Sequence, residues 1–260
     1  MEAAPGAVEA RGLVKTFGSL RAVDGLSLSV PAGAFYAFLG PNGAGKSTTL
    51  SMLTGVLEAS AGEIRILGQD LRDDPIAVKA QVGIVPEELT LFERLTGWQQ
   101  LIFSGRVYGL SDTVAAKRAK ELLKLTGLEG REHDEIAGYS KGMRRRLAIG
   151  AALVHAPRVV FLDEPFEGID VIAAGVVREL LQELGRRGVT VLLTTHVLAI
   201  ADRLATHAGI IAAGRMLAEG SVEALKARYE RDTLEAVFES LIEVPRAPEQ
   251  SLSFYGHAED

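Results

Sequence analysis

The sequence predicts an α/β fold with a mostly parallel sheet, and three observations lead to that class. Short apolar runs, typical of buried strands, alternate with helical stretches along much of the chain. A glycine-rich loop joins one of these runs to a helix. A long block of helical periodicity interrupts the alternation in the middle of the chain. We therefore expect a parallel sheet that is covered by helices and carries an inserted group of further helices.

The composition is that of a globular protein with a mild negative charge. The 260 residues include 28 basic and 34 acidic side chains, a formal net charge of -6, and 47% of the residues are hydrophobic. The basic residues are scattered rather than gathered into a stripe, so we expect no nucleic-acid partner. Cysteine is absent, which excludes disulfides, thiolate metal sites and a cysteine nucleophile. No signal-peptide pattern opens the chain, and no apolar run reaches the ~18 residues of a spanning helix, so we expect any role at a membrane to require a partner.

The N-terminal part predicts strands and then a helix. Residues 8–39 read as strand and hairpin, because apolar and polar residues alternate before a continuous apolar run that ends at Leu39. Helical periodicity follows over 45–57, and alternation returns over 63–68. A short apolar run at 82–85 ends at Pro86. We expect these segments to form an antiparallel N-terminal β subdomain and the first part of the main sheet.

Helices replace strands between Glu87 and Pro157. Helical segments are predicted at about 96–108, 111–125 and 140–155. We interpret this block as a helical subdomain inserted into the core. The predicted division of the chain is one domain over 1–244, with its core at 1–86 and 157–230, the helical subdomain at 87–156, a C-terminal helix at 232–244, and a tail at 245–260.

Strand signals return in the C-terminal part. Apolar runs at 159–162, 189–195 and 209–214 are separated by helical stretches. The final helix is expected to begin at Asp232, which has capping-box spacing to Glu235. Its apolar residues fall at amphipathic spacing, at Leu234, Val237, Phe238 and Leu241. Periodicity is lost after Pro245, so we expect a frayed tail there.

The most specific feature is the sequence GPNGAGKST, which matches the phosphate-binding loop pattern G-x-x-x-x-G-K-[ST]. It lies between an apolar strand and a helix, as the mechanism requires, and this context argues against an incidental glycine-rich turn. Backbone N–H groups of the loop and the positive end of the helix would bind phosphate oxygens. Lys46 would reach the β and γ phosphates, and Ser47 would ligate Mg²⁺. The predicted nucleotide-binding residues are Gly40, Pro41, Asn42, Gly43, Ala44, Gly45, Lys46, Ser47 and Thr48.

Polar residues also follow two later strands. Asp163 and Glu164 end the run VVFLDE, and in a parallel sheet ligands bind at that end of the strands. Asp163 would hold Mg²⁺, directly or through water, and Glu164 would point at the attacking water. Such a pair taken alone is more often a solvated turn, but together with the loop it predicts a P-loop NTPase core. His196 follows the run VLLTT and is a candidate γ-phosphate donor, although a lone histidine at a strand end is usually only partly solvated.

With these residues in place, the sequence from about Val8 to Leu241 resembles the ATP-binding-cassette (ABC) family of transport ATPases. The segment YSKGMRRR at 139–146 is similar to the family's signature loop, which separates this family from other P-loop ATPases. The Ser140 hydroxyl and the N–H groups at the start of a helix, with Gly142 in the turn, would cradle a γ-phosphate. In the family this cradle serves the ATP held by a second chain, so the resemblance implies a homodimer or a heterodimer.

The resemblance also implies roles for single residues. Phe17 matches the aromatic residue that stacks on adenine, although a loop phenylalanine is as often a core cap. Asp170 matches the aspartate of the loop that communicates across the dimer, and His196 matches the switch histidine, so that Lys46, Glu164 and His196 form the expected catalytic set. Glu87 stands where the family has a glutamine that contacts Mg²⁺, so that the implied metal ligands are Ser47, Asp163 and Glu87.

Glu87 leads to one hypothesis of its own. A carboxylate near a γ-phosphate has its pKa raised by like charge, and a protonated glutamate donates and accepts like glutamine. Glu87 would then work best at lower pH. The alternative is that Glu87 faces solvent or a basic residue of the partner.

The function that the resemblance implies is an ATP-hydrolysing subunit at the cytoplasmic face of the cell membrane, driving transport through separate membrane subunits. The cofactors implied are ATP and Mg²⁺. An apolar cluster at Leu91, Phe92, Leu95 and Trp98 marks the region that receives a cytoplasmic helix of the membrane subunit in the family. SKGMRRR and DTLEAVF are similar to exporter-type subunits, so we expect export. Import, a soluble ATPase acting on nucleic acid or ribosomes, and a hydrolytically silent partner are the alternatives.

Overall fold

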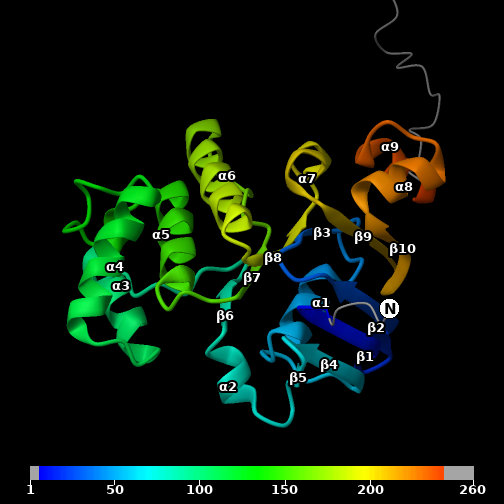
Figure 1. Cartoon of the computed structure of the whole chain (residues 1–260), viewed down its shortest axis with the longest axis horizontal. Helices are drawn as coiled ribbons and strands as arrows, with labels where there is room; N and C mark the ends of the chain where they lie inside the picture. Colours follow the sequence, from blue (N-terminus) through cyan, green and yellow to red (C-terminus); the bar gives the residue numbers. More distant parts are fainter. Residues whose placement is uncertain (1–5, 243–260) are drawn as a thin grey trace, which may run out of the picture.

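The computed structural model describes residues 6–242 and contains two sheets with helices packed around them (Figure 1). The first sheet is antiparallel with strand order β2-β1-β4-β5, and its strands are β1 (Val8–Phe17), β2 (Leu20–Val30), β4 (Ala61–Ile66) and β5 (Gln69–Asp70). The predicted antiparallel N-terminal sheet is therefore confirmed. Its strands β1, β2 and β4 correspond to the segments predicted as strand at 8–39 and 63–68, whereas β5 was not predicted.

The second sheet is mostly parallel, with strand order β10-β9-β3-β8-β7-β6. Its strands are β3 (Phe35–Leu39), β6 (Val82–Val85), β7 (Val159–Asp163), β8 (Thr190–Thr195), β9 (His207–Ala212) and β10 (Arg215–Ser221). Only the β9–β10 pair is antiparallel. Every residue of β3, β7 and β8 is buried, as expected of parallel strands that are covered on both faces.

The helices lie at three places in the chain. The first two are α1 (Lys46–Leu53) and α2 (Pro75–Lys79). The middle group is α3 (Gly97–Val107), α4 (Asp112–Leu125), the 3₁₀ turn η1 (Ile136–Gly138) and α5 (Lys141–Leu153). The last group is α6 (Val171–Arg186), α7 (Leu198–Leu204), α8 (Val222–Tyr229) and α9 (Leu234–Leu241). Figure 1 shows the middle group at one end of the molecule, and the antiparallel sheet with α8 and α9 at the other.

Alternating side chains of β3 show how the layers pack. Tyr36 and Phe38 belong to a core shared with α1 and the antiparallel sheet. Ala37 and Leu39 point to the opposite side, into a core shared with α7, α8 and α9. A third core joins β7 and β8 to α5 and α6. The sheet is thus held between two layers, and its strand ends are fixed in position.

Several predicted boundaries need correction. The first helix ends at Leu53 rather than near residue 57, because Gly55 takes a left-handed conformation (φ +66°) that ends the helix. The strand expected at 209–214 lies at 207–212. The last helix is capped by Thr233, whose hydroxyl accepts the Ala236 N–H, and not by Asp232. The predicted tail at 245–260 lies outside the described residues.

Candidate functional site

A cavity of about 510 Å³ opens where the parallel strands end. Its size is within the range of about 300–1,000 Å³ that ligand pockets occupy. The lining residues come from the β1–β2 hairpin, the loop before α1, and the segments that follow β6, β7 and β8: Phe17, Leu20, Ala22, Asn42, Gly43, Gly45, Lys46, Ser47, Thr48, Glu87, Glu164, Glu167 and His196. The fold therefore brings five separate segments of the chain to one cavity.

Glycines shape the loop between β3 and α1. Gly45 is left-handed (φ +99°), and a Cβ there would lie 2.6 Å from the Ala22 carbonyl oxygen. A Cβ on Gly40 would lie 2.6 Å from the Ile211 carbonyl oxygen. No other residue fits either position, so the loop packs closely against its neighbours. The helix that begins at Lys46 directs its free N–H groups into the cavity, where they can bind an anion.

Lys46 is buried at the floor of this loop, with 7% of its surface exposed. Its Nζ donates to the carbonyl oxygens of Gly40 at 2.8 Å and Pro41 at 3.2 Å. Burial lowers the pKa of the ammonium, while the negative charges of Glu164, Asp163 and Glu87 oppose that shift. The lysine thus presents a charged donor next to the place where phosphate would bind.

Asp163 is the centre of a short chain of hydrogen bonds. Ser47 Oγ donates to its Oδ1 at 3.2 Å, and Thr194 Oγ1 donates to the same oxygen at 2.5 Å. Thr194 Oγ1 in turn accepts the backbone N–H of Glu164 at 3.0 Å. Thr194 lies in the core and was not singled out from the sequence, although it directly precedes the Thr195–His196 pair.

The donors at this point suit Mg²⁺. Residues 6–242 contain no group of three or more His, Cys, Asp or Glu side chains that could hold a metal by themselves. One carboxylate and one hydroxyl are nevertheless what Mg²⁺ uses when substrate phosphates and water supply its remaining ligands. Ser47 and Asp163 fit that donor set, and Glu87 lines the same cavity.

Glu164 and His196 face each other at the cavity wall. His196 Nδ1 lies 3.0 Å from Glu164 Oε2. The carboxylate is shielded, with 9% of its side chain exposed, whereas the imidazole is 52% exposed. Glu164 also has a left-handed backbone (φ +45°), which is unusual for a residue with a side chain. The arrangement points a shielded carboxylate, oriented by a histidine, into the cavity.

Glu87 reaches the cavity from the segment after β6. Although Glu87 is exposed, partial desolvation raises the pKa of its carboxyl, and the negative charges of Asp163, Glu167 and Glu164 raise it further, while Arg145 opposes them. The direction of this pKa shift is the one that the hypothesis expects, but its first cause is desolvation rather than the charge of a phosphate. The exposure of Glu87 is what the alternative expects, so the role of Glu87 stays a prediction. Glu167, which sequence reasoning missed, contributes to this cluster and lines the cavity.

Phe17 lies at the rim of the cavity beside Leu20. Its ring is 48% exposed, so it does not cap the core. Lys15 Nζ lies 5.3 Å from the ring centroid, within cation–π range. The exposed ring can therefore receive a flat, aromatic ligand group.

Ser140 and Gly142 do not line this cavity. Ser140 is exposed and caps α5, where its Oγ accepts the Met143 N–H at 3.2 Å. Gly142 packs against α6, and a Cβ there would lie 3.1 Å from the Ala173 Cβ. Asp170 caps α6 through the Ala173 N–H at 2.8 Å. The signature turn is thus a second, exposed helix start that one chain does not bring to its own phosphate loop.

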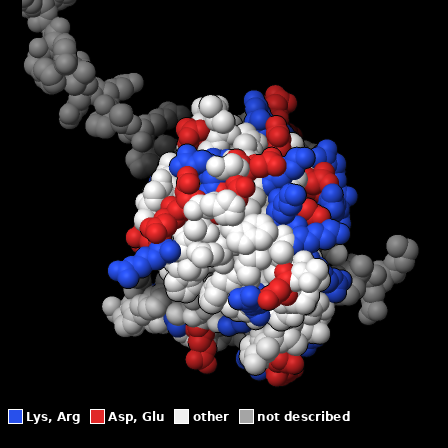
Figure 2. Space-filling model, turned by 90° about the vertical axis from the view of Figure 1, so that its left-hand side faces the viewer, with Lys and Arg blue, Asp and Glu red and all other residues white. Residues whose placement is uncertain are grey.

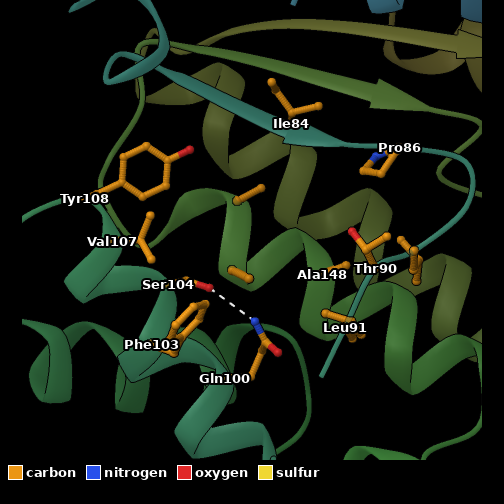
Figure 3. A pocket seen from close by; sticks show the side chains of 13 residues that line it. Ile84, Pro86, Thr90, Leu91, Gln100, Phe103, Ser104, Val107, Tyr108 and Ala148 are labelled. Carbon is orange, nitrogen blue, oxygen red and sulfur yellow. Dashed lines mark hydrogen bonds between the residues drawn. The ribbon is translucent and has the colours of Figure 1, made fainter. Parts of the chain in front are cut away.

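A second hollow, which we call the apolar groove, lies between α3, α5 and the segment after β6 (Figure 3). It is lined mainly by apolar side chains: Ile84, Pro86, Leu89, Thr90, Leu91, Gln100, Phe103, Ser104, Val107, Tyr108, Ala148, Ala151 and Ala152. Figure 3 shows Gln100 and Ser104 joined by a hydrogen bond of 3.4 Å at its base. Phe103 and Val107 remain 43% and 66% exposed. The groove is therefore a mainly apolar hollow that the described chain leaves open.

The predicted cluster agrees with this groove only in part. Leu91 lines it, and Phe92 packs edge-on against Phe103 with centroids 5.1 Å apart. Leu95 is not among its lining residues, and Trp98 lines a separate hollow together with Leu123. Figure 2 shows the face on the side of α3 and α4, where an uncharged area lies between borders of mixed positive and negative side chains.

Comparisons with known proteins agree on one family. The model of a family described as "ABC transporter" matches residues 23–167. The daunorubicin/doxorubicin resistance ATP-binding protein of Streptomyces peucetius is 43% identical over 85% of this chain and 67% of its own length. The Nod factor export ATP-binding protein I of Burkholderia lata is 40% identical over 84% of this chain and 72% of its own length. A solved ATP-binding subunit of an ABC transporter is 32% identical, with a TM-score of 0.84 over 90% of this chain and 99% of its own.

Proposed function

The chain belongs to the ABC transporter family, and we propose that it is the ATP-hydrolysing subunit that drives an exporter. Proteins of this family bind and hydrolyse ATP, and the chain is an ATPase of this class. The observation that carries the proposal is the single cavity that the phosphate loop, Glu164 and His196 line, with Asp163 buried beside it and bonded to Ser47. Relatives named for drug resistance and for Nod factor export favour export over import.

The residues of the cavity support a division of labour in hydrolysis. The loop N–H groups and Lys46 would bind the phosphates, and Phe17 would stack on the adenine. Ser47 and Asp163, with Glu87 beside them, would hold Mg²⁺, which supplies charge neutralisation at the phosphates when bound. Catalysis then consists mainly of positioning and electrostatic stabilisation.

Glu164 would carry the proton transfer. A water oxygen attacks the γ-phosphorus as the bond from that phosphorus to the β–γ bridging oxygen breaks, so the products are ADP and phosphate. Glu164 accepts the proton of the attacking water. His196, 3.0 Å from Glu164 Oε2, would orient the carboxylate and reach the γ-phosphate. The position of Glu164 supports this role, because its carboxylate lines the cavity and is held by His196.

ABC ATP-binding subunits dimerise and work with membrane subunits. In this chain the exposed Ser140 turn would bind the γ-phosphate held by the phosphate loop of a second chain, identical or homologous. Hydrolysis removes that shared phosphate, so the closed dimer loses its differential stabilisation and reopens. This cycle would drive the membrane subunits between their states.

The apolar groove is the proposed contact with the membrane subunit. Within residues 6–242, no helix has the length and apolarity that crossing a bilayer requires. We propose from the likeness to export ATP-binding proteins that a separate membrane subunit supplies the pathway and that the chain sits peripherally at the cytoplasmic face. An amphipathic helix fits such a groove by burying its apolar face.

The test is to purify the tagged chain from detergent-solubilised membranes of its host and to identify what accompanies it by mass spectrometry. A polytopic membrane protein in stoichiometric amount is the expected result. Val107→Lys, at the groove, should lose that protein, whereas Val114→Lys, an exposed apolar position on α4 outside the groove, should retain it. Recovery of the chain alone, or with ribosomes or DNA, would overturn the export proposal while leaving the ATPase in place.

A further inference from the structure

Three consecutive arginines, Arg144 to Arg146, lie in the first turns of α5. A run of like charges is usually a solvated face. Here each guanidinium instead donates to backbone carbonyl oxygens of a different segment. The three side chains therefore tie the signature helix to three neighbouring loops.

Two of these arginines hold the helical end of the molecule together. Arg144 donates to the carbonyl oxygens of Ala137 at 3.0 Å and Tyr139 at 3.2 Å. Arg146 donates to those of Thr126 at 2.7 Å and Gly127 at 2.9 Å, at the end of α4. Arg144 also pairs with Glu93, before α3, through Nη1 and Oε1 at 2.7 Å. Within the described chain, neither arginine is hydrogen-bonded to a residue that lines the nucleotide cavity, so we treat their role as structural.

Arg145 differs because it reaches toward the nucleotide cavity. Its Nη1 donates to the Pro86 carbonyl oxygen at 2.9 Å, and its Nη2 donates to the Glu87 carbonyl oxygen at 3.0 Å. Only 2% of the residue is exposed, and Nε has no partner within residues 6–242. Burial lowers the pKa of the guanidinium, while the carboxylates of Glu167, Glu87, Asp163 and Glu164 oppose the shift. The buried guanidinium of Arg145 therefore binds the backbone of Glu87, a residue that lines the cavity.

Leu89 and Leu91 pack the segment after β6 against the core, but its hydrogen bonds come from Arg145. Beyond the strand pairing of β6, the hydrogen bonds that hold residues 86–91 within the described chain are the two from Arg145. The next residue with a further bond is Phe92, whose N–H donates to Gln100. The polar contacts that hold the backbone at Pro86 and Glu87 thus come from one side chain.

We propose that Arg145 is a positioning residue for ATP hydrolysis, which fixes the backbone at Pro86 and Glu87 and links that segment to the signature helix. Ser140 lies at the start of the same helix, five positions before Arg145. A shift of the Glu87 segment is therefore passed through the guanidinium to the surface that meets the second chain. The inference rests on the proposed function, because it assigns the link to the hydrolytic cycle.

An arginine suits this task better than a lysine. The planar guanidinium can serve two carbonyl oxygens at once in a fixed direction, whereas an ammonium is a point charge on a flexible stem. Helix α5 itself is already anchored by buried Leu147, Ile149 and Leu153 and by the other two arginines. Loss of Arg145 is thus expected to release the segment at 86–91 rather than the helix.

The test compares Arg145→Met and Arg145→Lys with Arg146→Met, a matched loss of two carbonyl contacts on the same helix. In Arg145→Met, kcat should fall about 10–100-fold, as expected for outer-shell positioning groups, while the KM for ATP stays within about twofold. The kcat of Arg145→Lys should lie between that of Arg145→Met and that of wild type. Arg146→Met should melt at a lower temperature yet keep wild-type turnover per folded molecule.

Hydrogen exchange measured by mass spectrometry supplies the second readout. In wild type, ATP should slow exchange both in the 40–48 loop and in residues 84–92. In Arg145→Met, the loop should still be protected by ATP, but residues 84–92 should exchange about tenfold faster and no longer respond. If Arg145→Met does not fold, Arg145→Lys decides between the same outcomes.

Equal losses of kcat in Arg145→Met and Arg146→Met, or an unchanged kcat and unchanged exchange in Arg145→Met, would overturn the positioning role. Failure of the proposed function has a different signature. In that case the wild-type chain itself would hydrolyse no ATP or would bring down no membrane protein.

Discussion

The two helix starts of this molecule that offer N–H groups to phosphate are built in opposite ways. At the cavity, α1 begins beneath a glycine loop and is surrounded by Lys46, Asp163 and Glu164, all of them buried. At the signature turn, α5 begins at the exposed Ser140, which only caps its own helix. The first is preorganised by five segments of one chain. The second has a donor and a dipole but no enclosure of its own.

The difference shows where the chain depends on another molecule. At the cavity, Lys46, Ser47 and Asp163 are already held in place by hydrogen bonds within the chain. Binding at the Ser140 turn becomes favourable only when something else covers it and excludes water. Variants at the cavity should therefore act within one chain, whereas variants at the turn should act only when two chains meet.

The largest effect is expected inside the cavity. Glu164→Gln keeps the shape of the side chain and its contact with His196 but removes the base, so kcat should fall about 10²–10⁴-fold. ATP affinity should stay near wild type, because phosphate and adenine contacts are unchanged. Steady-state ATPase assays and titration calorimetry measure the two quantities. Turnover at the wild-type rate would remove Glu164 from the mechanism.

The second-largest effect is expected at the Ser140 turn, and it should appear only when two chains form a dimer. Ser140→Ala should reduce turnover about tenfold and abolish the ATP-dependent dimer of a Glu164→Gln background, while one chain binds ATP as before. Light scattering after size exclusion detects the dimer.

Loss of the helix cap alone must be separated from this effect. Removing an N-cap serine costs about 1 kcal/mol of stability wherever it stands. Ser111→Ala removes the equivalent cap of α4, where Ser111 Oγ accepts the Val114 N–H at 3.4 Å. That variant should be destabilised similarly but dimerise normally. A dimer defect of equal size in both variants would assign the turn a purely structural role.

A smaller effect is expected at the cavity rim. Phe17→Ala should weaken ATP binding about fivefold, because stacking on an aromatic ring is worth about 1–3 kcal/mol per base and Phe17 is half-exposed. Phe17→Tyr keeps the ring and should bind like wild type. Affinity for inorganic triphosphate should be the same in all three proteins, and a parallel loss there would contradict stacking.

The smallest effect concerns pH. The pKa of Glu87 is raised, so its protonated, glutamine-like form gains population as the pH falls toward that pKa. The ratio of wild-type turnover to Glu87→Gln turnover should therefore rise as the pH is lowered toward the pKa of Glu87. The ratio is measured across a pH series in one buffer system. Superimposed profiles of the two proteins would exclude a role for this proton.

The features that the sequence predicts well are those in which neighbouring residues share one task. The phosphate loop, its flanking strand and helix, and the acidic pair after β7 are local, and the α/β class follows from the buried runs. The edge strand β10 and the short α2 escaped prediction, because half-exposed strands and single helical turns carry weak periodicity. Assignment of the capping role to Asp232 failed for a local reason, since the next residue, Thr233, has an equally suitable side chain.

Contacts between distant segments were harder to predict. Leu91 and Trp98 have the spacing of one helical face, yet a helix start at Thr96 separates them and sends them to different hollows. In the sequence, Arg145 is only one of three neighbouring basic residues. Its role could not be predicted because its carbonyl partners lie 58 and 59 positions earlier in the chain. The roles of the site residues and the domain boundaries at 86/87 and 156/157 remain predictions.

The left-handed backbone of Glu164 (φ +45°) means that activity and folding stability are opposed at this residue. A side chain in that conformation costs about 1–2 kcal/mol relative to glycine, which adopts it freely. Glu164→Gly would therefore be inactive, but it would relieve the backbone strain at this position. Glu164→Gln would keep that strain. Selection for stability alone would favour glycine here, and a glutamate persists only where the carboxylate is worth more than the stability lost.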